Sequence, residues 1–360
     1  MEAFPIPQEH ATGRKLADHA LSILSRKAYT LRTYSSRAYR ARIGAVLAER
    51  RPDLVHLDSL DLASYLPLFE GLPVVCTHHN IESKLLRRRA ESRAYPLRGY
   101  LALQADWVAE VEQYWCPRVA LNVTVSDQDG AELLRLAPGS RVEVIPNGVD
   151  TARFQPRRGS EDGIAFVGGA NWFPNTDALD FFTSEILPLI RAGGANPRVR
   201  WIGRSSPAQQ AHFASKAGIE LTGYVDDWRP FVADAACYVV PLRVGGGTRL
   251  KILDAWAMGK AVVSTSVGCE GLEARDGDNI LIRDTPEAFA QAVGVVLRDT
   301  ALRSRLGESA RRTVEQHYGW DSIGEKMNRL YRALATWSEV LTTARDERPR
   351  PPRFSARDQS

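Results

Sequence analysis

Residues 237–259 read CYVVPLRVGGGTRLKILDAWAMG, an apolar run followed by three glycines and then by a helical pattern. The run Cys237–Val240 predicts a buried strand, and apolar residues recur at helical spacing from Leu250 to Ala257. A strand, a glycine-rich turn and a helix in this order form the repeating unit of α/β folds with a parallel sheet. The stretch therefore predicts such a fold, with a functional loop where the strand passes into the helix.

The chemistry of this loop suits an anion. Glycines allow close approach to backbone N–H groups, the start of a helix adds a partial positive charge, and Arg249 and Lys251 add two full charges. A diphosphate is the ligand that this combination fits best. Asp254 follows one to two turns into the helix, where its carboxylate could accept hydrogen bonds from ribose hydroxyls. The alternative is a flexible turn followed by a solvated helix start.

Similar runs occur on both sides of this stretch and divide the chain into two halves. The first half contains four strand candidates, at 54–57, 74–77, 122–125 and 142–145, after a helical region at 16–50. The second half contains six, at 164–167, 199–202, 220–222, 237–240, 261–263 and 279–282. We predict an amino-terminal domain over 1–156, a carboxy-terminal domain over 157–318, a helix over 319–341 that returns to the first domain, and a disordered tail over 342–360.

Glycines follow several strands of the second half. The paired Gly168 and Gly169 would open a Rossmann half at its switch point, and two further strands end at Gly203-Arg204 and Gly223-Tyr224. All these loops belong at the carboxyl edge of one parallel sheet, where such folds bind ligands. The first half lacks the strand and glycine-rich turn that normally open a Rossmann unit, so this half is predicted to be reduced or to start late.

Net charge, cysteine content and hydropathy limit the classes of protein to which this chain could belong. The chain has 360 residues, 44% hydrophobic content and a formal net charge of +4, which gives no argument for nucleic acid. Its four cysteines form no CxxC pair, so they indicate neither a disulfide framework nor a metal site. No signal peptide or membrane-length apolar stretch is visible, so we expect a cytoplasmic protein.

Two basic segments could meet a membrane or a phosphate-bearing acceptor. Residues 14–51 contain ten Lys or Arg against only Asp18 and Glu49, and residues 87–89 are three consecutive arginines. The alternative is a solvated helix face. We expect peripheral contact with the inner face of the membrane if the first interpretation holds.

Residues 141–290 resemble the carboxy-terminal domain of family 4 retaining glycosyltransferases with the GT-B fold, two Rossmann-like domains facing a cleft. The resemblance lies in residues 144–150, the Gly168 loop, and residues 223–227, 245–255 and 268–272. Residues 53–56, 77–82 and 125–129 add a likeness to a bacterial branch involved in exopolysaccharide assembly. The resemblance implies a retaining sugar transferase that uses a nucleotide-diphosphate donor, a glycan or lipid-linked acceptor, and neither a cofactor nor a metal.

The resemblance also assigns roles on the donor side. Arg249 and Lys251 would neutralise the diphosphate and stabilise the departing nucleotide. Asp254 replaces a ribose-binding glutamate, and a second family glutamate is replaced by Gly246. The backbone of Gly223–Val225 would hold the base. The full donor-binding set is Gly168, Gly169, Arg204, Tyr224, Val225, Gly246, Gly247, Thr248, Arg249, Lys251 and Asp254.

On the amino-terminal side, His79 matches the family histidine thought to meet the transferring sugar, with His78 as the weaker candidate. Asn80 and Glu82 would lie on the acceptor side, where Glu82 could orient His79, bind acceptor or cap the next helix. The pair Asp226-Asp227 is interpreted as the start of a loop and not as a metal site. Two other functions stay open: a non-catalytic protein of the same fold, and a sugar-nucleotide epimerase.

Overall fold

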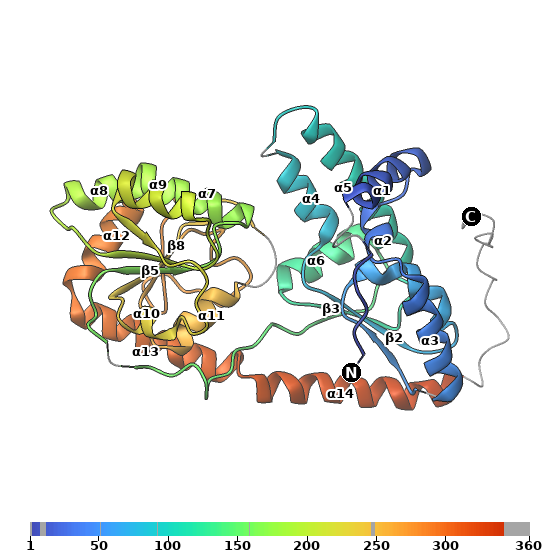
Figure 1. The fold of residues 1–360 in the computed structure, drawn as a ribbon. Coiled ribbons are helices and arrows are strands. Elements are labelled where there is room, and N and C mark those ends of the chain that lie inside the picture. Colours follow the sequence, from blue (N-terminus) through green and yellow to red (C-terminus); the bar gives the residue numbers. More distant parts are fainter. Residues whose placement is uncertain are drawn as a thin grey trace.

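The computed structural model describes residues 2–7, 12–50, 52–91, 93–157, 159–245 and 249–341. They form two α/β domains, each built on one parallel sheet, as Figure 1 shows. The predicted disordered tail at 342–360 and the glycines Gly246 and Gly247 lie outside the described residues.

The amino-terminal sheet has four strands in the order β1-β2-β3-β4, all parallel. They are β1 (Val55–Leu57), β2 (Val74–His78), β3 (Leu121–Thr124) and β4 (Val142–Val144). All four predicted runs are confirmed. No strand precedes β1 among the described residues, which form helices there.

The helices of this domain surround the sheet and extend above it (Figure 1). They are α1 (Thr12–Ser25), α2 (Tyr29–Thr33), α3 (Arg37–Glu49), the 3-10 helix η1 (Leu60–Phe69), α4 (Glu82–Glu91), α5 (Leu97–Trp115) and α6 (Asp127–Leu136). The cysteines Cys76 and Cys116 are buried in the core beneath them.

The carboxy-terminal sheet has six parallel strands in the order β10-β9-β8-β5-β6-β7. They are β5 (Ile164–Val167), β6 (Val199–Ile202), β7 (Ile219–Leu221), β8 (Cys237–Val240), β9 (Val262–Ser264) and β10 (Leu281–Ile282). All six predicted runs are confirmed within one or two residues. The chain reverses its direction across the sheet between β5 and β8, and this switch point is where open α/β sheets bind ligands.

Helices cover both faces of this sheet (Figure 1). They are α7 (Phe173–Phe181), the π-helix η2 (Phe182–Ile186), α8 (Leu187–Ala192), α9 (Pro207–Ala217), α10 (Arg229–Ala233), α11 (Leu250–Ala257), α12 (Pro286–Arg298) and α13 (Thr300–His317). The strands are continuous apolar runs because side chains on both faces are buried.

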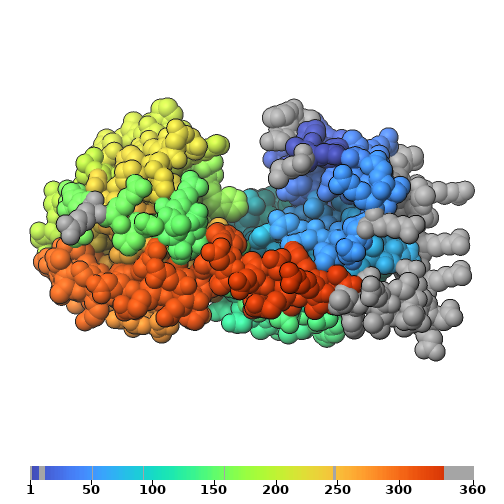
Figure 2. Space-filling view, turned by 90° about the horizontal axis from the view of Figure 1, so that it is seen from below, coloured from blue at the N-terminus to red at the C-terminus, as the bar shows by residue number. Residues whose placement is uncertain are grey.

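The last helix, α14 (Trp320–Leu341), returns to the amino-terminal domain (Figure 1). The crossing is tied by a hydrogen bond of 2.8 Å from the Val149 amide to the Tyr318 carbonyl. Beyond it, Ile323 and Leu334 are buried against Val75 and its neighbours in the sheet. Figure 2 shows an open groove between the two domains, with the red α14 and its junction below.

Candidate functional site

The glycine loops after β5, β6 and β7 pack against one another at the carboxyl edge of the sheet. Gly203 has φ +144°, and a Cβ there would lie 2.7 Å from the Gly169 nitrogen and 2.8 Å from the Gly168 carbonyl carbon. Gly203 also forms a bridge with Gly223. Only glycine allows these backbones to approach so closely, so the predicted set of loops forms one continuous surface.

Lys251 extends from the start of α11 to this surface. Its Nζ donates a hydrogen bond of 2.8 Å to Asn175 Oδ1, and Asn175 Nδ2 donates one of 3.0 Å to the Gly169 carbonyl. Burial, with a smaller contribution from Arg249, lowers the pKa of Lys251 to about 7. The tertiary structure thus brings a cation from α11 to the Gly168 loop.

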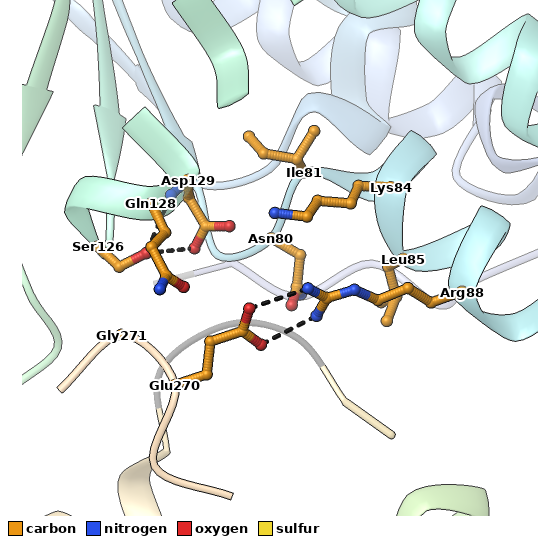
Figure 3. A pocket seen from close by; sticks show the side chains of 10 residues that line it. All are labelled: Asn80, Ile81, Lys84, Leu85, Arg88, Ser126, Gln128, Asp129, Glu270 and Gly271. Carbon is orange, nitrogen blue, oxygen red and sulfur yellow. Dashed lines mark hydrogen bonds and ion pairs between the residues drawn. The ribbon is translucent and has the colours of Figure 1, made fainter. Parts of the chain in front are cut away.

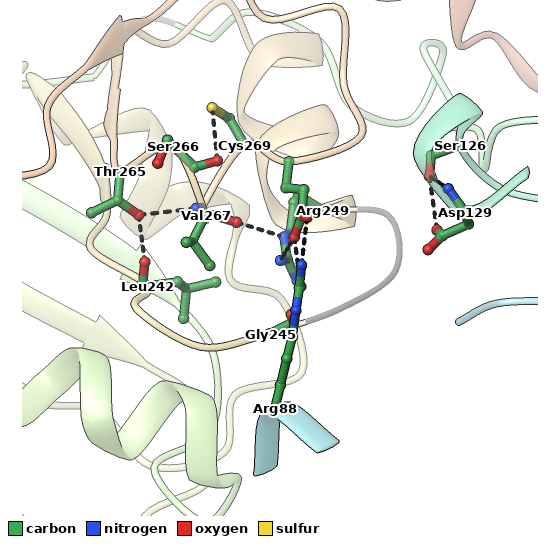
Figure 4. Close-up of polar contacts among 12 residues, drawn as sticks. Arg88, Ser126, Asp129, Leu242, Gly245, Arg249, Thr265, Ser266, Val267 and Cys269 are labelled. Atoms are coloured by element: carbon green, nitrogen blue, oxygen red, sulfur yellow. Dashed lines mark hydrogen bonds and ion pairs between the residues drawn. The ribbon is translucent and has the colours of Figure 1, made fainter. Parts of the chain in front are cut away.

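Arg249, directly before α11, contacts the loop after β9 instead. Its side chain is 5% exposed, its Nε donates to the Val267 carbonyl at 3.1 Å, and its Nη2 lies 3.3 Å from Glu270 Oε2 (Figure 4). Burial lowers the pKa of Arg249. Gly246, Gly247 and Thr248 lie outside the described residues, so the predicted roles of these three residues stay predictions.

Asp254 lies one turn into α11 and has no hydrogen-bond partner among the described residues. Burial raises the pKa of its carboxyl group to about 7, and the charge of Arg153 partly opposes that shift. A half-buried carboxyl group of this kind could accept hydrogen bonds from sugar hydroxyls, and the contact of Asp254 with the ribose stays a prediction.

Tyr224 is exposed beside the glycine loops. The Arg204 guanidinium carbon lies 5.4 Å from the centre of its ring, a cation–π contact. Val225 packs against the domain core. The predicted base-binding segment therefore combines an exposed ring with a fixed backbone.

On the amino-terminal side, the two histidines have different roles. His78 is buried, and its Nε2 lies 2.9 Å from Asn122 Oδ1, so it is a core residue. His79 is exposed, and its Nε2 lies 3.2 Å from Asp58 Oδ1. Asp58 is the residue that our sequence reasoning missed. It follows β1 as His79 follows β2, and adjacent parallel strands bring such positions to one edge.

A cavity of about 220 Å³ lies beside His79. Glu82 lines it, but its carboxylate accepts from Asn80 Nδ2 at 3.4 Å, so Asp58, and not Glu82, is the carboxylate paired with His79. Burial raises the pKa of Glu82, and that of Glu112 at the same cavity, to about 7. The full lining is Ala28, Thr30, Leu31, Ser59, Leu60, Asp61, Thr77, His78, His79, Asn80, Glu82, Val108, Val111 and Glu112. Among these described residues there is no Lys or Arg, which suits a hydroxyl-bearing ligand better than an anionic one.

The domains touch at a narrow cavity of about 20 Å³ that Asn80 also lines (Figure 3). Both oxygens of Glu270 accept hydrogen bonds of 2.9 Å from Arg88 of α4. Gly271 has φ +82°, and a Cβ there would lie 3.1 Å from the Cβ of Ser126 at the start of α6. The carboxy-terminal loop after β9 therefore lies directly on the amino-terminal domain.

This contact corrects the interpretation of residues 87–89 as a basic surface. Arg88 faces the other domain, and Arg87 pairs with Asp106 of α5 at 2.8 Å. A run of like charges on one helix is separated in this way because consecutive residues point in directions about 100° apart.

The structure also places the acidic pair after β7. The Asp227 carboxylate lies 2.7 Å from Arg229 Nε, and this hydrogen bond holds the pKa of Asp227 at about 2. Across the described part of the chain, no three His, Cys, Asp or Glu side chains are grouped as metal ligands would be.

Comparison with known proteins matches both halves of the chain to glycosyltransferase families. Residues 9–153 match the family described as Glycosyltransferase Family 4, and residues 161–299 match the family described as Glycosyl transferases group 1. A lipopolysaccharide core biosynthesis glycosyltransferase of Rhizobium meliloti, LpsE, is 34% identical over 29% of this chain and 31% of its own length. A D-inositol 3-phosphate glycosyltransferase of Salinispora arenicola is 27% identical over 72% of this chain and 63% of its own length. The chain thus spans less than two thirds of the length of these curated relatives.

Solved structures share the fold at low sequence identity. Sucrose-phosphate synthase from Thermosynechococcus elongatus has a TM-score of 0.66 and 19% identity, covering 84% of this chain and 80% of that one. HepE from Anabaena, solved in complex with UDP and glucose, has a TM-score of 0.62 and 13% identity, covering 82% of this chain and 81% of that one.

Proposed function

We propose that this chain, which matches Glycosyltransferase Family 4 over its amino-terminal part and Glycosyl transferases group 1 over its carboxy-terminal part, is a GT-B glycosyltransferase that transfers a sugar from a nucleotide-diphosphate donor to a hydroxyl acceptor. The observation that carries the proposal is the position of Lys251, a half-buried ammonium group beside the Gly168 loop at the switch point. A cation taken out of water lowers the energy of a diphosphate leaving group more than an exposed cation would. Arg249, Asp254 and the Gly223 loop complete the donor side.

The finer parts of the proposal concern stereochemistry and pathway. We propose retention at the anomeric carbon and a role in exopolysaccharide or cell-surface glycan synthesis. The family 4 match and the lipopolysaccharide core relative support this assignment. Proton NMR of the first-formed product tests retention, since an inverted anomer contradicts it.

We propose that the reaction requires neither a cofactor nor a metal, because Lys251 and Arg249 supply positive charge where a metal would otherwise neutralise the diphosphate. Activity that persists in excess EDTA is the expected result. Activity restored only by a divalent cation contradicts it.

The donor is tested by thermal shift, because a ligand that binds only the native state raises its stability. UDP is the first probe, since HepE binds it on the same fold. We expect UDP or another nucleoside diphosphate to raise Tm, and Lys251→Met to abolish the shift. Lys216→Met, an exposed lysine on α9, is the matched control. An undiminished shift in Lys251→Met removes this residue from the donor site.

A non-catalytic protein of the same fold is the second candidate, favoured by the four-stranded amino-terminal sheet and by Asp254 in place of a glutamate. The two are separated by donor turnover. Binding of the nucleotide without product or donor hydrolysis, across a panel of hydroxyl acceptors, supports the second candidate.

We also propose that α1 rests on an anionic membrane surface at the cytoplasmic face. No described helix combines the length and apolar content needed to cross a bilayer. The helix α1 buries polar residues and exposes apolar ones, the reverse of an ordinary amphipathic helix. Asp18 and Ser22 are buried, whereas Leu16 and Leu24 are 68% and 80% exposed. Four basic residues flank the exposed leucines, namely Arg14, Lys15, Arg26 and Lys27. Apolar side chains surrounded by cations fit the boundary of anionic lipids.

The membrane proposal is tested by sedimentation with phosphatidylglycerol vesicles, with phosphatidylcholine vesicles as the control. We expect binding to the anionic vesicles alone and its loss in the double variant Leu16→Ser, Leu24→Ser. Equal binding by that variant contradicts the proposed role of α1.

A further inference from the structure

Glu270 lies between two arginines, one from each domain. Arg88 of α4 binds both of its oxygens at 2.9 Å, and Arg249 of the donor loop lies 3.3 Å from Oε2. A guanidinium that binds a carboxylate through two parallel hydrogen bonds fixes both distance and orientation. Glu270 is therefore held at a defined point beside the predicted diphosphate site.

Arg88 also contacts the donor loop directly. Its Nη1 donates a hydrogen bond of 2.8 Å to the Gly245 carbonyl (Figure 4), at the edge of the loop that continues into Gly246. The side chains of Arg88 and Glu270 are 34% and 23% exposed, so the contact is partly shielded from water. A residue of the amino-terminal domain thus holds one end of a loop that belongs to the carboxy-terminal domain.

The charges at this point favour a specific arrangement. Two guanidinium groups share one carboxylate, which leaves one net positive charge beside the loop. Lys84 and Asp129 line the same cavity and offset each other. Without Arg88, the carboxylate of Glu270 would neutralise Arg249, and the diphosphate would meet no net charge on this side.

We propose that Arg88 is a donor-positioning residue, which acts through Glu270 and the Gly245 carbonyl to keep the charge of Arg249 available to the diphosphate. The inference rests on the proposed function. It means that the donor site is complete only when the amino-terminal domain lies against the carboxy-terminal loop, so donor binding and domain arrangement are coupled.

The test is a charge cycle on Arg88 and Glu270, with UDP and inorganic pyrophosphate as probes measured by calorimetry. Arg88→Gln should bind both probes about tenfold more weakly than the unmodified protein, the scale of one charge acting at short range. Glu270→Gln should bind at least as tightly as the unmodified protein. The double variant should return to within about threefold of it, because the net charge is restored.

A merely structural role gives a different pattern. If the contact only held the domains together, Glu270→Gln would weaken binding as much as Arg88→Gln does, and the double variant would recover nothing. That pattern overturns the proposal. Arg87→Gln, the neighbouring arginine that pairs within its own domain, is the matched control and should bind as the unmodified protein does.

Two further variants keep the outcomes separate. Arg88→Lys retains the charge without the two parallel hydrogen bonds, and its affinity for the probes should fall less than threefold. This variant is used in place of Arg88→Gln if Arg88→Gln does not fold. If the unmodified protein binds neither probe, the proposed function fails with this inference. A different result overturns the inference alone. In that case the unmodified protein and Arg88→Gln bind the probes equally well, whereas Lys251→Met does not bind them.

Discussion

Two cations border the glycine loops of the carboxy-terminal domain, whereas carboxyl groups and histidines, with no Lys or Arg among the described lining residues, line the cavity beside His79 in the amino-terminal domain. Lys251 and Arg249 lie at the start of α11 in the domain with the six-stranded sheet. Glu82 and Glu112 line the cavity of a four-stranded sheet that lacks a strand before β1 among its described residues. This difference is the basis of our proposal that one half recognises its ligand by charge and the other by hydrogen bonds to hydroxyls. The following changes test that division, from the largest expected effect to the smallest.

Truncating the helix that supports the amino-terminal sheet should separate the stabilities of the two domains. Leu334 of α14 is 2% exposed and packs with Val75 and Leu121. Leu334→Ala should cost about 3 kcal/mol, the usual cost of a cavity in a packed core. In a urea titration, we expect the amino-terminal domain to unfold first and the carboxy-terminal transition to stay in place. Arg329→Ala, at an exposed position of the same helix, should change little, and equal stability of both variants would contradict the supporting role of α14.

Removing His79 should affect turnover and leave nucleotide binding intact. His79→Ala should reduce kcat by about 100-fold, a typical effect for a polar group that contacts the reacting centre. The affinity for UDP should stay within about twofold, because His79 belongs to the other half of the site. Asp58→Asn should lose less, since it acts on His79 through one hydrogen bond of 3.2 Å. His212→Ala is the control. A loss of UDP affinity in His79→Ala as large as its loss of kcat would contradict the division between the two halves.

Asp254 should contribute to recognition of the ribose. Its carboxyl group has no partner among the described residues and could accept hydroxyl hydrogen bonds without first breaking others. Asp254→Ala should weaken UDP binding by about tenfold and reduce the preference for UDP over 2′-deoxy-UDP. Asp226→Asn, an exposed carboxylate near Tyr224, serves as the control. An unchanged preference in calorimetry would place the ribose elsewhere.

The smallest effect concerns pH. Burial lowers the pKa of Lys251 to about 7, so the free protein loses this charge as pH rises through neutrality. UDP affinity should therefore fall a few-fold between about pH 6.5 and 8.5. Lys251→Arg keeps its charge throughout and should show a flatter profile, which also corrects for the ionisation of UDP itself. Parallel profiles in the two proteins would mean that Lys251 is already fully charged when it is free.

The strands, and the strand and helix on either side of the glycine-rich turn, could be predicted because their signals are local. Apolar runs such as 237–240 mark buried strands, and a phosphate site made of backbone amides needs glycines at adjacent positions. The same reasoning identified Arg249, Lys251 and Asp254 as a group, because all three lie at the start of one helix. His79 was found from its resemblance to a family histidine.

Other parts of the site depend on residues far apart in the chain. The pairing of Asp58 with His79, the contact of Lys251 with Asn175 and the bridge from Arg88 to Glu270 join residues separated by 21, 76 and 182 positions. No local pattern records such pairs. The sequence left open whether 87–89 meet a membrane, an acceptor or solvent, and Arg88 meets the other domain instead. The sequence shows the charge of a side chain but not the direction in which it points.

The sequence by itself determined two parallel α/β domains and a cationic loop, since strand periodicity and glycine-rich turns are properties of neighbouring residues. Only the tertiary structure decided which cations reach which surface, which carboxylate accompanies His79, and that the inward face of α1 is its polar one. Those outcomes depend on packing, where the burial of one side chain fixes the surroundings of another that lies far away along the chain.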